Sequence, residues 1–386
     1  MVGKAAFLER LYKNIKLFQA VKPGQMLEGS SPPSVFIGRY GYPKVEIGPL
    51  VPPITGDTRE MDLPEAWLPA KKQALDIAQF RLNLIRGKQQ VHVRDQSRTT
   101  ELVREIALAE RPTEVEVQLT KPPVGGFFHE DVQPFGPSAP LKELRVDAGQ
   151  WDPHLERAFY DTDQTAKGAI LDLYERGDLP ISSIQRGLSV GAFGLGKNRK
   201  LVPTRWSITA VDSTLSETFL DQIRAFPSIE THQVYEACSL NNRFLVLLSP
   251  GLWRYETLEA FFPQVIGDTL EVFGDFEEFA GRKTYASIGG CYYSARLAVA
   301  EKLLEEKKQA QALILREVYE GYIPLGVFNV RENVRQALAC PAMEFESWPQ
   351  ALSYALSRLR LPLSTWAAHA RTLRDRATQT SLRAFC

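Results

Sequence analysis

The sequence predicts an α+β protein, in which helices and short antiparallel strands form a compact body that ends in a flexible C-terminal tail. Helical and extended patterns are intermixed along the chain, without the regular strand–helix–strand rhythm of a doubly wound sheet. Hydrophobic residues make up 44% of the 386 residues, which is enough to bury large cores. We expect a Gly- and Pro-rich N-terminal α+β region over residues 1–150, a C-terminal α+β region over 151–370, and the flexible tail over 371–386.

Short strands and helices separated by Gly- and Pro-rich segments are predicted for the N-terminal region. Apolar residues recur at helical spacing over 4–20, and the prolines between Pro32 and Pro53 preclude a long helix there. The remaining elements are expected, in order, as strands at 34–37 and 44–47, helices at 67–86 and 101–110, and strands at 113–119 and 141–146.

The C-terminal region is predicted to contain more helices. Two of them, at 165–176 and 181–190, flank a Gly-Asp-Leu-Pro break, and a basic, glycine-containing loop follows over 191–200. Asp212 and Ser213 are expected to cap a helix that follows a strand. The later elements are expected as that strand at 206–211, a hairpin within 231–256, a helix at 292–312, a strand at 324–330, and helices at 331–339, 349–359 and 364–374.

The charges of the chain balance. Lys plus Arg and Asp plus Glu each number 46, so the formal net charge is zero. Proteins that coat nucleic acid non-specifically usually carry a basic excess, because neutralisation of phosphates drives that binding. Any contact of this protein with DNA must therefore be local, or be supplied by a partner.

The cysteines and the hydropathy pattern narrow the class of protein further. Four scattered cysteines form no CxxC pair, which excludes a sequence-local zinc ribbon and gives no sign of a disulfide framework. No run of about 18 apolar residues occurs, so no membrane partner is expected. We predict a cytoplasmic protein without a metal or a dedicated cofactor, although a bound nucleotide fits one hypothesis below.

The last eight residues carry a short motif. Leu382 and Phe385 are three residues apart and would align on one turn of a 3₁₀ helix, while Gln379 adds an amide. This Q-x-x-L-x-x-F pattern resembles the peptide by which many repair and replication proteins bind the PCNA sliding clamp. It departs from many such peptides at Cys386, where they have a second aromatic residue. The motif predicts a clamp-binding peptide; the alternatives are a chance pattern and a tail that packs on its own domain.

Longer segments resemble signatures of the archaeal Nre proteins. They lie at 30–44, 135–141, 198–212, 281–286, 322–327 and 331–335, and the block Val-Pro-Thr-Arg-Trp-Ser-Ile-Thr-Ala is specific. The resemblance implies a role in the repair of DNA damage, and clamp binding through Gln379, Leu382 and Phe385. Some members carry an N-terminal four-cysteine zinc finger. This sequence lacks it, so no metal role is carried over.

The loop at 191–200 is a candidate site for phosphate or nucleic acid. Its glycines permit close approach of a ligand to the backbone. It is not a Walker loop, because no Gly-Lys-Ser/Thr follows, and its spacing does not fit the dinucleotide fingerprint. The alternative is a solvated basic turn, and the two preceding helices could also form a helix-turn-helix motif. The candidate side chains are Lys197, Asn198, Arg199, Lys200 and Arg205.

A second group of charged residues lies in otherwise apolar surroundings in the C-terminal half. Buried Arg and Glu are tolerated only when they are paired. The group predicts either a phosphate- or nucleotide-binding pocket, for which Arg282 and Arg331 are the candidates, or a structural network of ion pairs. Its members are Arg282, Lys283, Arg296, Arg316, Glu317, Arg331, Glu332 and Arg335.

Other polar clusters favour structural roles. Asp161 and Asp163 could bind a metal, but such pairs more often cap a helix, and one is predicted directly after them. The adjacent residues 129–131 (His-Glu-Asp) cannot easily converge on one ion. No arrangement typical of a catalytic nucleophile emerges.

Three hypotheses for the function follow. The first is a DNA-repair factor that the clamp recruits to DNA, with direct DNA contact favoured by a continuous basic face over 197–200. The second is an enzyme acting on a nucleotide or nucleic acid, favoured by a deep pocket lined by Arg205, Arg282 and Arg331. The third is a structural partner of another repair protein.

Overall fold

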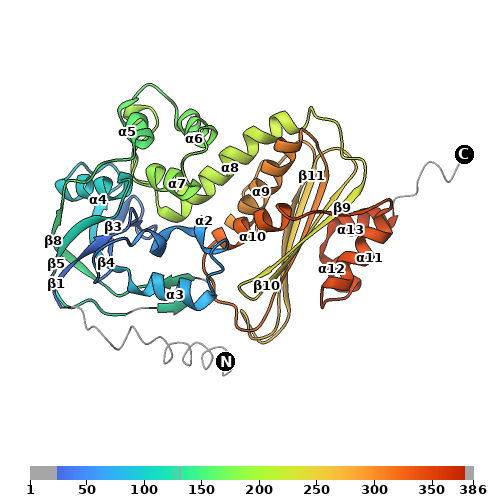
Figure 1. The fold of residues 1–386 in the computed structure, drawn as a ribbon, viewed down its shortest axis with the longest axis horizontal. Coiled ribbons are helices and arrows are strands. Elements are labelled where there is room, and N and C mark those ends of the chain that lie inside the picture. Colours follow the sequence, from blue (N-terminus) through green and yellow to red (C-terminus); the bar gives the residue numbers. More distant parts are fainter. Residues whose placement is uncertain (1–23, 126, 130–131, 379–386) are drawn as a thin grey trace, which may run out of the picture. The chain divides into compact units, whose positions relative to one another are not determined.

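The computed structural model describes residues 24–125, 127–129 and 132–378, which divide into two compact units (Figure 1). The N-terminal unit holds the described residues up to Leu215, together with Ile323–Gly326. The C-terminal unit holds Ser216–Tyr322 and the described residues from Val327 onward. The division thus lies near residue 215, whereas the sequence suggests one near 150. The prediction of an α+β fold is confirmed, since each unit combines a mixed sheet with helices.

The N-terminal unit is built on a six-stranded sheet of order β1-β5-β8-β4-β3-β2. The β4–β8 pair is parallel and the other neighbours are antiparallel. A separate hairpin pairs β6 with β7. The strands are β1 (Met26–Ser31), β2 (Val35–Ile37), β3 (Lys44–Val51), β4 (Ile85–His92), β5 (Thr113–Leu119), β6 (Phe127–His129), β7 (Val132–Phe135) and β8 (Ser138–Val146).

Strand β5 shows most clearly how side chains alternate between the core and the surface. Val115, Val117 and Leu119 are buried while Glu114 and Glu116 are exposed, as the period of two requires. Helix α4 (Arg98–Leu108) contacts β2, β3 and β8. The expected strand at 113–119 and the expected helix at 101–110 are therefore confirmed, the helix with a start three residues earlier.

The other helical segments of the N-terminal unit are short. The prediction of one long helix over 67–86 is wrong, because Pro69 interrupts the helical segment and β4 begins at Ile85. Gln73 and Asp76 form a capping box that starts a new helix instead. These segments are η2 (Arg59–Asp62), α2 (Pro64–Trp67), α3 (Ala74–Asn83), α5 (Pro153–Tyr160), α6 (Ala166–Glu175), α7 (Ile181–Ser189) and η3 (Gly196–Asn198).

Helix α8 (Thr204–Ile223) replaces the strand expected at 206–211. The carbonyl oxygen of Pro203, directly before the first residue of the helix, accepts hydrogen bonds from the N–H groups of Trp206 and Ser207. Val211 and Leu215 are buried at helical spacing. A six-residue apolar run does not distinguish a buried strand from one face of a helix. Asp212 therefore lies inside the helix, where its carboxylate accepts a hydrogen bond from Gln185 at 2.9 Å, and it is not a cap.

The C-terminal unit is built on a second six-stranded sheet, of order β12-β11-β13-β10-β9-β14. The β11–β13 pair is parallel and the others are antiparallel. Leu240 and Asn241 both have positive φ, as the two-residue turn of the β9–β10 hairpin requires. The strands are β9 (His232–Ser239), β10 (Asn242–Ser249), β11 (Arg254–Phe261), β12 (Glu271–Glu277), β13 (Gln311–Val318) and β14 (Met343–Phe345).

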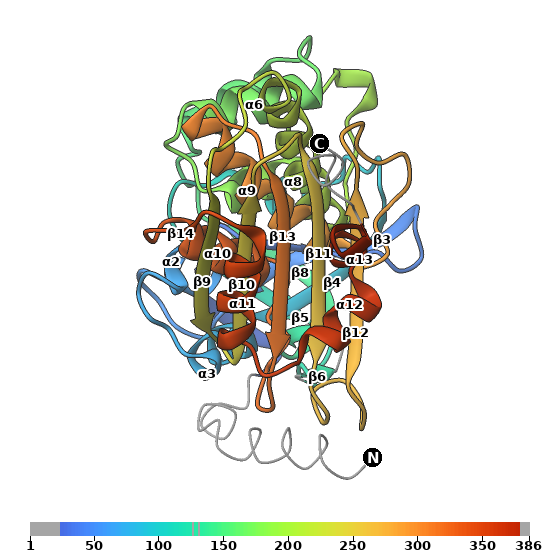
Figure 2. The ribbon, with the colours of Figure 1, turned by 90° about the vertical axis from the view of Figure 1, so that its right-hand side faces the viewer.

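Helices cover both faces of this sheet, as Figure 2 shows. On one face lie α9 (Gly290–Glu306) and α10 (Phe328–Leu338). On the other lie α11 (Trp348–Arg358), α12 (Leu363–His369) and α13 (Arg371–Thr378). Trp366 and Leu373 from these last helices join the strands in one buried apolar cluster.

Two predictions for the C-terminal unit are wrong. The helix expected over 292–312 ends at Glu306, because Lys307 adopts a left-handed conformation that terminates it, and Gln311 already belongs to β13. The strand expected at 324–330 is absent from the described chain, where Phe328 starts α10. The helix expected over 349–359 is present as α11, whereas the one expected over 364–374 is divided at Ala370 into α12 and α13.

Residues 371–378, which are predicted to belong to the flexible tail, form a helix that is anchored to the sheet. The backbone N–H groups of Arg371 and Thr372 donate to the Glu256 carboxylate at 2.6 and 2.7 Å. Asp375 of the same helix pairs with Arg254. The proposed clamp-binding residues Gln379, Leu382 and Phe385 lie outside the described residues. Within the described ranges, no helix combines the length and the apolar character needed to cross a membrane.

Candidate nucleic-acid interface

The loop after α7 is closed by backbone contacts. Gly191 has φ of 68°, and a Cβ there would lie 2.7 Å from the carbonyl oxygen of Lys200, so only glycine allows the two segments to meet. The N–H of Val202 donates to Ser189 at 2.8 Å, and the N–H of Leu201 donates to Val93 of the strand end at 2.7 Å. These bonds fix the position of Lys200.

Arg199 of this loop has a structural role. Its guanidinium donates to the carbonyl oxygens of Ala158, Phe159 and Asp161 at the end of α5, and to that of Gly194. The last carbonyls of a helix have no partner within the helix and favour a positive charge. Burial lowers the pKa of Arg199 somewhat, and the side chain is occupied by its own chain.

Lys200 lies instead beside two aromatic rings. Its Nζ is 3.2 Å from the hydroxyl oxygen of Tyr42 and 6.0 Å from the centre of that ring. The rings of Tyr42 and Trp206 have centroids 5.2 Å apart and are tilted by 50°. Trp206 belongs to the first turn of α8, next to Arg205. The turn that carries Tyr42 therefore meets the stretch from Lys200 to Trp206, which is distant from it in sequence.

The turn between β2 and β3 carries Tyr42 and is fixed on both sides. Gly41 has φ of 82° and accepts a hydrogen bond from the N–H of Lys44 at 2.9 Å. The carbonyl of Pro43 accepts from the N–H of Val93 at 2.9 Å. Before the turn, the N–H of Ile37 donates to Thr204 Oγ1 at 3.1 Å, which links β2 to the start of α8. The backbone at Tyr42 and at Trp206 is therefore held by hydrogen bonds and does not belong to an unattached loop.

We define the aromatic–cation surface as the exposed side chains of this region. Tyr40, Tyr42 and Trp206 are 78%, 40% and 44% exposed, which is unusual for three large rings in one region. Arg39 lies over the Tyr40 ring, 5.0 Å from its centre. The surface comprises Arg39, Tyr40, Tyr42, Lys44, Lys200, Arg205 and Trp206.

The cations of the aromatic–cation surface are free of carboxylates. Among the described residues, none of them makes an ion pair within 4.0 Å. Unpaired cations attract phosphate, and exposed rings offer faces on which bases stack. This arrangement suits nucleic acid better than it suits a small apolar ligand. The other predicted loop residues, Lys197 and Asn198, lie exposed in η3 of the same loop.

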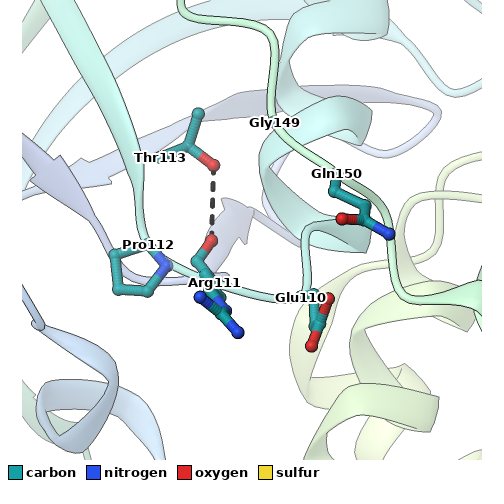
Figure 3. A pocket seen from close by; sticks show the side chains of 6 residues that line it. All are labelled: Glu110, Arg111, Pro112, Thr113, Gly149 and Gln150. Atoms are coloured by element: carbon teal, nitrogen blue, oxygen red, sulfur yellow. Dashed lines mark hydrogen bonds between the residues drawn. The ribbon is translucent and has the colours of Figure 1, made fainter.

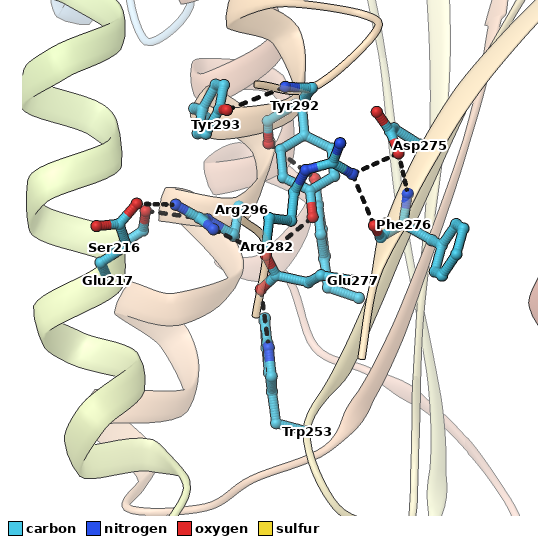
Figure 4. A network of polar contacts seen from close by, with 12 residues as sticks. Ser216, Glu217, Trp253, Asp275, Phe276, Glu277, Arg282, Tyr292, Tyr293 and Arg296 are labelled. Atoms are coloured by element: carbon cyan, nitrogen blue, oxygen red, sulfur yellow. Dashed lines mark hydrogen bonds and ion pairs between the residues drawn. The ribbon is translucent and has the colours of Figure 1, made fainter. Parts of the chain in front are cut away.

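The charged residues of the C-terminal unit form an internal network, shown in Figure 4. The buried Glu277 carboxylate accepts hydrogen bonds from Arg296 at 2.8 Å, from the Tyr292 hydroxyl at 3.0 Å and from Trp253 Nε1 at 3.0 Å. Burial alone would lower the pKa of Arg296, but the adjacent Glu277 carboxylate outweighs it and raises that pKa. Burial is also the main reason why the pKa of Tyr292 is raised.

Arg282 and Arg331, the candidate phosphate-binding residues of this unit, are also engaged. Arg282 pairs with Asp275 and donates to the Phe276 carbonyl. Arg331 is buried and its Nε lies 2.9 Å from a carboxylate oxygen of Glu332. These contacts fit the structural alternative for the cluster.

The hollow drawn in Figure 3 lies elsewhere in the N-terminal unit. It has a volume of about 270 Å³, and its lining combines one carboxylate, one guanidinium, one hydroxyl and one amide. Its lining residues are Glu110, Arg111, Pro112, Thr113, Gly149 and Gln150.

Two further candidates have structural explanations. Helix α7 is buried along most of its length and contacts α2, α4 and α6, so it cannot enter a DNA groove as a recognition helix. Asp161 accepts hydrogen bonds from the N–H groups of Asp163 and Gln164, which makes a turn before α6, whose actual cap is Thr165. Of the His-Glu-Asp run at 129–131, the last two residues lie outside the described ranges.

The aromatic members of the surface were missed from the sequence, although a signal existed. Both Gly-Arg-Tyr-Gly-Tyr-Pro-Lys at 38–44 and Thr-Arg-Trp at 204–206 alternate cations with aromatic residues. Such alternation is typical of nucleic-acid binding, but an isolated tyrosine or tryptophan is more often part of a core. Only the structure shows that these rings are exposed and adjacent.

The fold and the side chains define a two-unit α+β protein with a local surface of exposed aromatic rings and cations. Comparison with known families shows that the chain matches "Archaeal Nre, N-terminal" over residues 3–266 and "Archaeal Nre, C-terminal" over residues 277–385. The protein belongs to the archaeal Nre family. No solved structure matches it.

Curated relatives match along nearly their whole length. DNA repair protein NreB of Archaeoglobus fulgidus is 43% identical over 365 residues, which cover 92% of this chain and 91% of the relative. DNA repair protein NreA of the same organism is 34% identical, covering 90% and 89%. DNA repair protein NreA of Haloferax volcanii is 33% identical, covering 87% and 83%.

Proposed function

We propose that this protein is a DNA-repair factor that contacts nucleic acid through the aromatic–cation surface and is brought to DNA by its C-terminal peptide. The names of its relatives support the repair role. The observation that carries the nucleic-acid contact is the group of exposed rings around Tyr42 and Trp206, with cations that pair with no carboxylate of the described residues.

A local interface agrees with the charge of the chain. With a net charge of zero, the protein has no general attraction for DNA. The cations of the aromatic–cation surface provide positive charge at one place, and each phosphate that they contact releases a bound counterion. Binding is therefore expected to be moderate and to weaken as the salt concentration rises.

Fluorescence anisotropy with labelled DNA over a range of salt concentrations tests this contact. Replacing Lys200 and Arg205 by alanine should weaken binding and reduce the salt slope by about one for each lost phosphate contact. The charge-matched control replaces Arg98 and Arg145, two exposed arginines that already pair with glutamates. Equal losses in the two double variants would show that the surface has no special role.

Recruitment is assigned to Gln379, Leu382 and Phe385. Removing the Leu and Phe side chains from water supplies roughly 3–6 kcal/mol before the cost of ordering the peptide. That cost leaves a micromolar affinity as the natural expectation. Isothermal titration calorimetry with a PCNA clamp should show that Leu382→Ala combined with Phe385→Ala abolishes binding. Unchanged affinity would remove the recruitment proposal.

A further inference from the structure

We propose that the aromatic–cation surface is specific for unpaired bases, so that single-stranded DNA binds there in preference to duplex DNA. This inference rests on the proposed function, since it names the form of nucleic acid that the same surface takes. The cations alone would serve either form, because both carry phosphates. The aromatic rings make the difference.

An exposed aromatic ring can stack only with a ligand that has an exposed planar face of its own. In a duplex, each base is stacked between its neighbours and its faces are covered, whereas an unpaired base can stack on Tyr or Trp. Tyr42 and Trp206 touch each other at a tilt of 50°, so they are not parallel walls of one slot. Each ring is therefore free to receive a different base on its outer face.

Cations accompany the exposed rings. Lys200 Nζ lies beside the Tyr42 hydroxyl, and Arg39 donates to the Tyr40 hydroxyl at 3.2 Å. Arg205 precedes Trp206 in the first turn of α8. A single strand presents bases and phosphates in alternation along its length. The pairing of ring and cation matches that alternation, with bases on the rings and phosphates at the cations.

The rings are held in place before any ligand arrives. The bonds from Ile37 to Thr204, from Val93 to Pro43 and from Leu201 to Val93 join the turn, the loop and the start of α8. A preorganised surface loses little conformational entropy on binding, so stacking energy is retained as affinity. Double-stranded DNA gains no stacking from this preorganisation, because its bases remain paired.

The test compares single-stranded and duplex DNA on the full-length protein. Anisotropy would be measured with labelled oligothymidylate of about 20 nucleotides and with a duplex of matched length, both at one moderate salt concentration. We expect the single strand to bind at least about tenfold more tightly. Trp206→Leu and Tyr42→Leu should each weaken binding of the single strand about 5- to 150-fold and leave duplex binding almost unchanged.

Matched controls separate stacking from folding. Tyr42→Phe keeps the ring and should bind the single strand within about threefold of the unchanged protein, and urea unfolding of each variant checks that it is folded. Equal affinity for both forms, or leucine variants that bind the single strand normally, would overturn this inference while leaving the proposed function standing. Absence of binding to either form, even at low salt, would overturn both.

Discussion

Two groups of cations, one in each unit, have opposite surroundings. In the C-terminal unit, Arg296 and Arg282 lie against the carboxylates of Glu277 and Asp275. In the N-terminal unit, Lys200 and Arg205 face solvent near aromatic rings and have no acidic partner among the described residues. The first arrangement stabilises a fold, and the second leaves charge free for a ligand. The role of a basic residue therefore depends on its neighbours.

The largest expected effect concerns the stability that depends on the cations paired with carboxylates. Glu277→Ala would leave Arg296 buried without its main counter-charge, which we expect to cost about 3–5 kcal/mol of unfolding free energy. The neighbouring Glu278 is a matched control, because it is about half exposed and makes only surface ion pairs. Its replacement by alanine should cost less than about 1 kcal/mol.

Urea denaturation followed by circular dichroism would measure both changes. Similar small losses for the two variants would mean that Arg296 finds another partner. In that event, the distinction between a structural network and a free surface would be weaker than we infer.

The next largest expected effect is a difference in stability between variants at two positions of one loop. Arg199→Ala removes the donor to several carbonyls at the end of α5, and we expect a loss of about 1–2 kcal/mol. Lys197→Ala, two residues earlier, should change stability by less than about 0.5 kcal/mol because that side chain is exposed. If the two variants unfold at the same urea concentration, the assigned structural role of Arg199 is incorrect.

The smallest effect concerns pH. Burial would raise the pKa of Asp275, but hydrogen bonds from Arg282, Ser287 and Phe276 outweigh it, so this pKa lies below its ordinary value. A carboxyl group with a lowered folded-state pKa stabilises the protein above its unfolded pKa of about 4. That contribution is lost as the pH falls through the lower, folded-state pKa.

Asp275→Asn should therefore be less stable than the unchanged protein at neutral pH, and the difference should shrink at pH values near about 3. Urea midpoints measured at neutral and acidic pH would show this convergence. A difference that stays constant with pH would indicate that the variant acts through packing and not through charge.

Local sequence patterns predicted part of this fold. The period of two in β5 and the apolar spacing of α6 and α7 depend on neighbouring residues alone, and those predictions are confirmed. The patterns failed where the tertiary structure decides the outcome. The apolar run at 206–211 fits a strand as well as a helix, and only its packing as part of α8 resolves the choice.

The candidate site shows the same limit. Sequence reasoning named Lys200 and Arg205, which belong to the aromatic–cation surface, but it grouped them with Arg199, which the structure turns toward α5. It could not place Tyr42 beside Trp206, because their adjacency depends on the β2–β3 turn meeting the start of α8.

The anchoring of α13 has a mechanical consequence for recruitment. Helix α13, which Glu256 and Arg254 hold to the sheet, is described as far as Thr378, and Gln379 follows directly in the sequence. In the proposed complex, a clamp that binds this peptide would pull on the sheet of the C-terminal unit through α13. The proposed recruitment would thus tether this unit to DNA and raise its local concentration there.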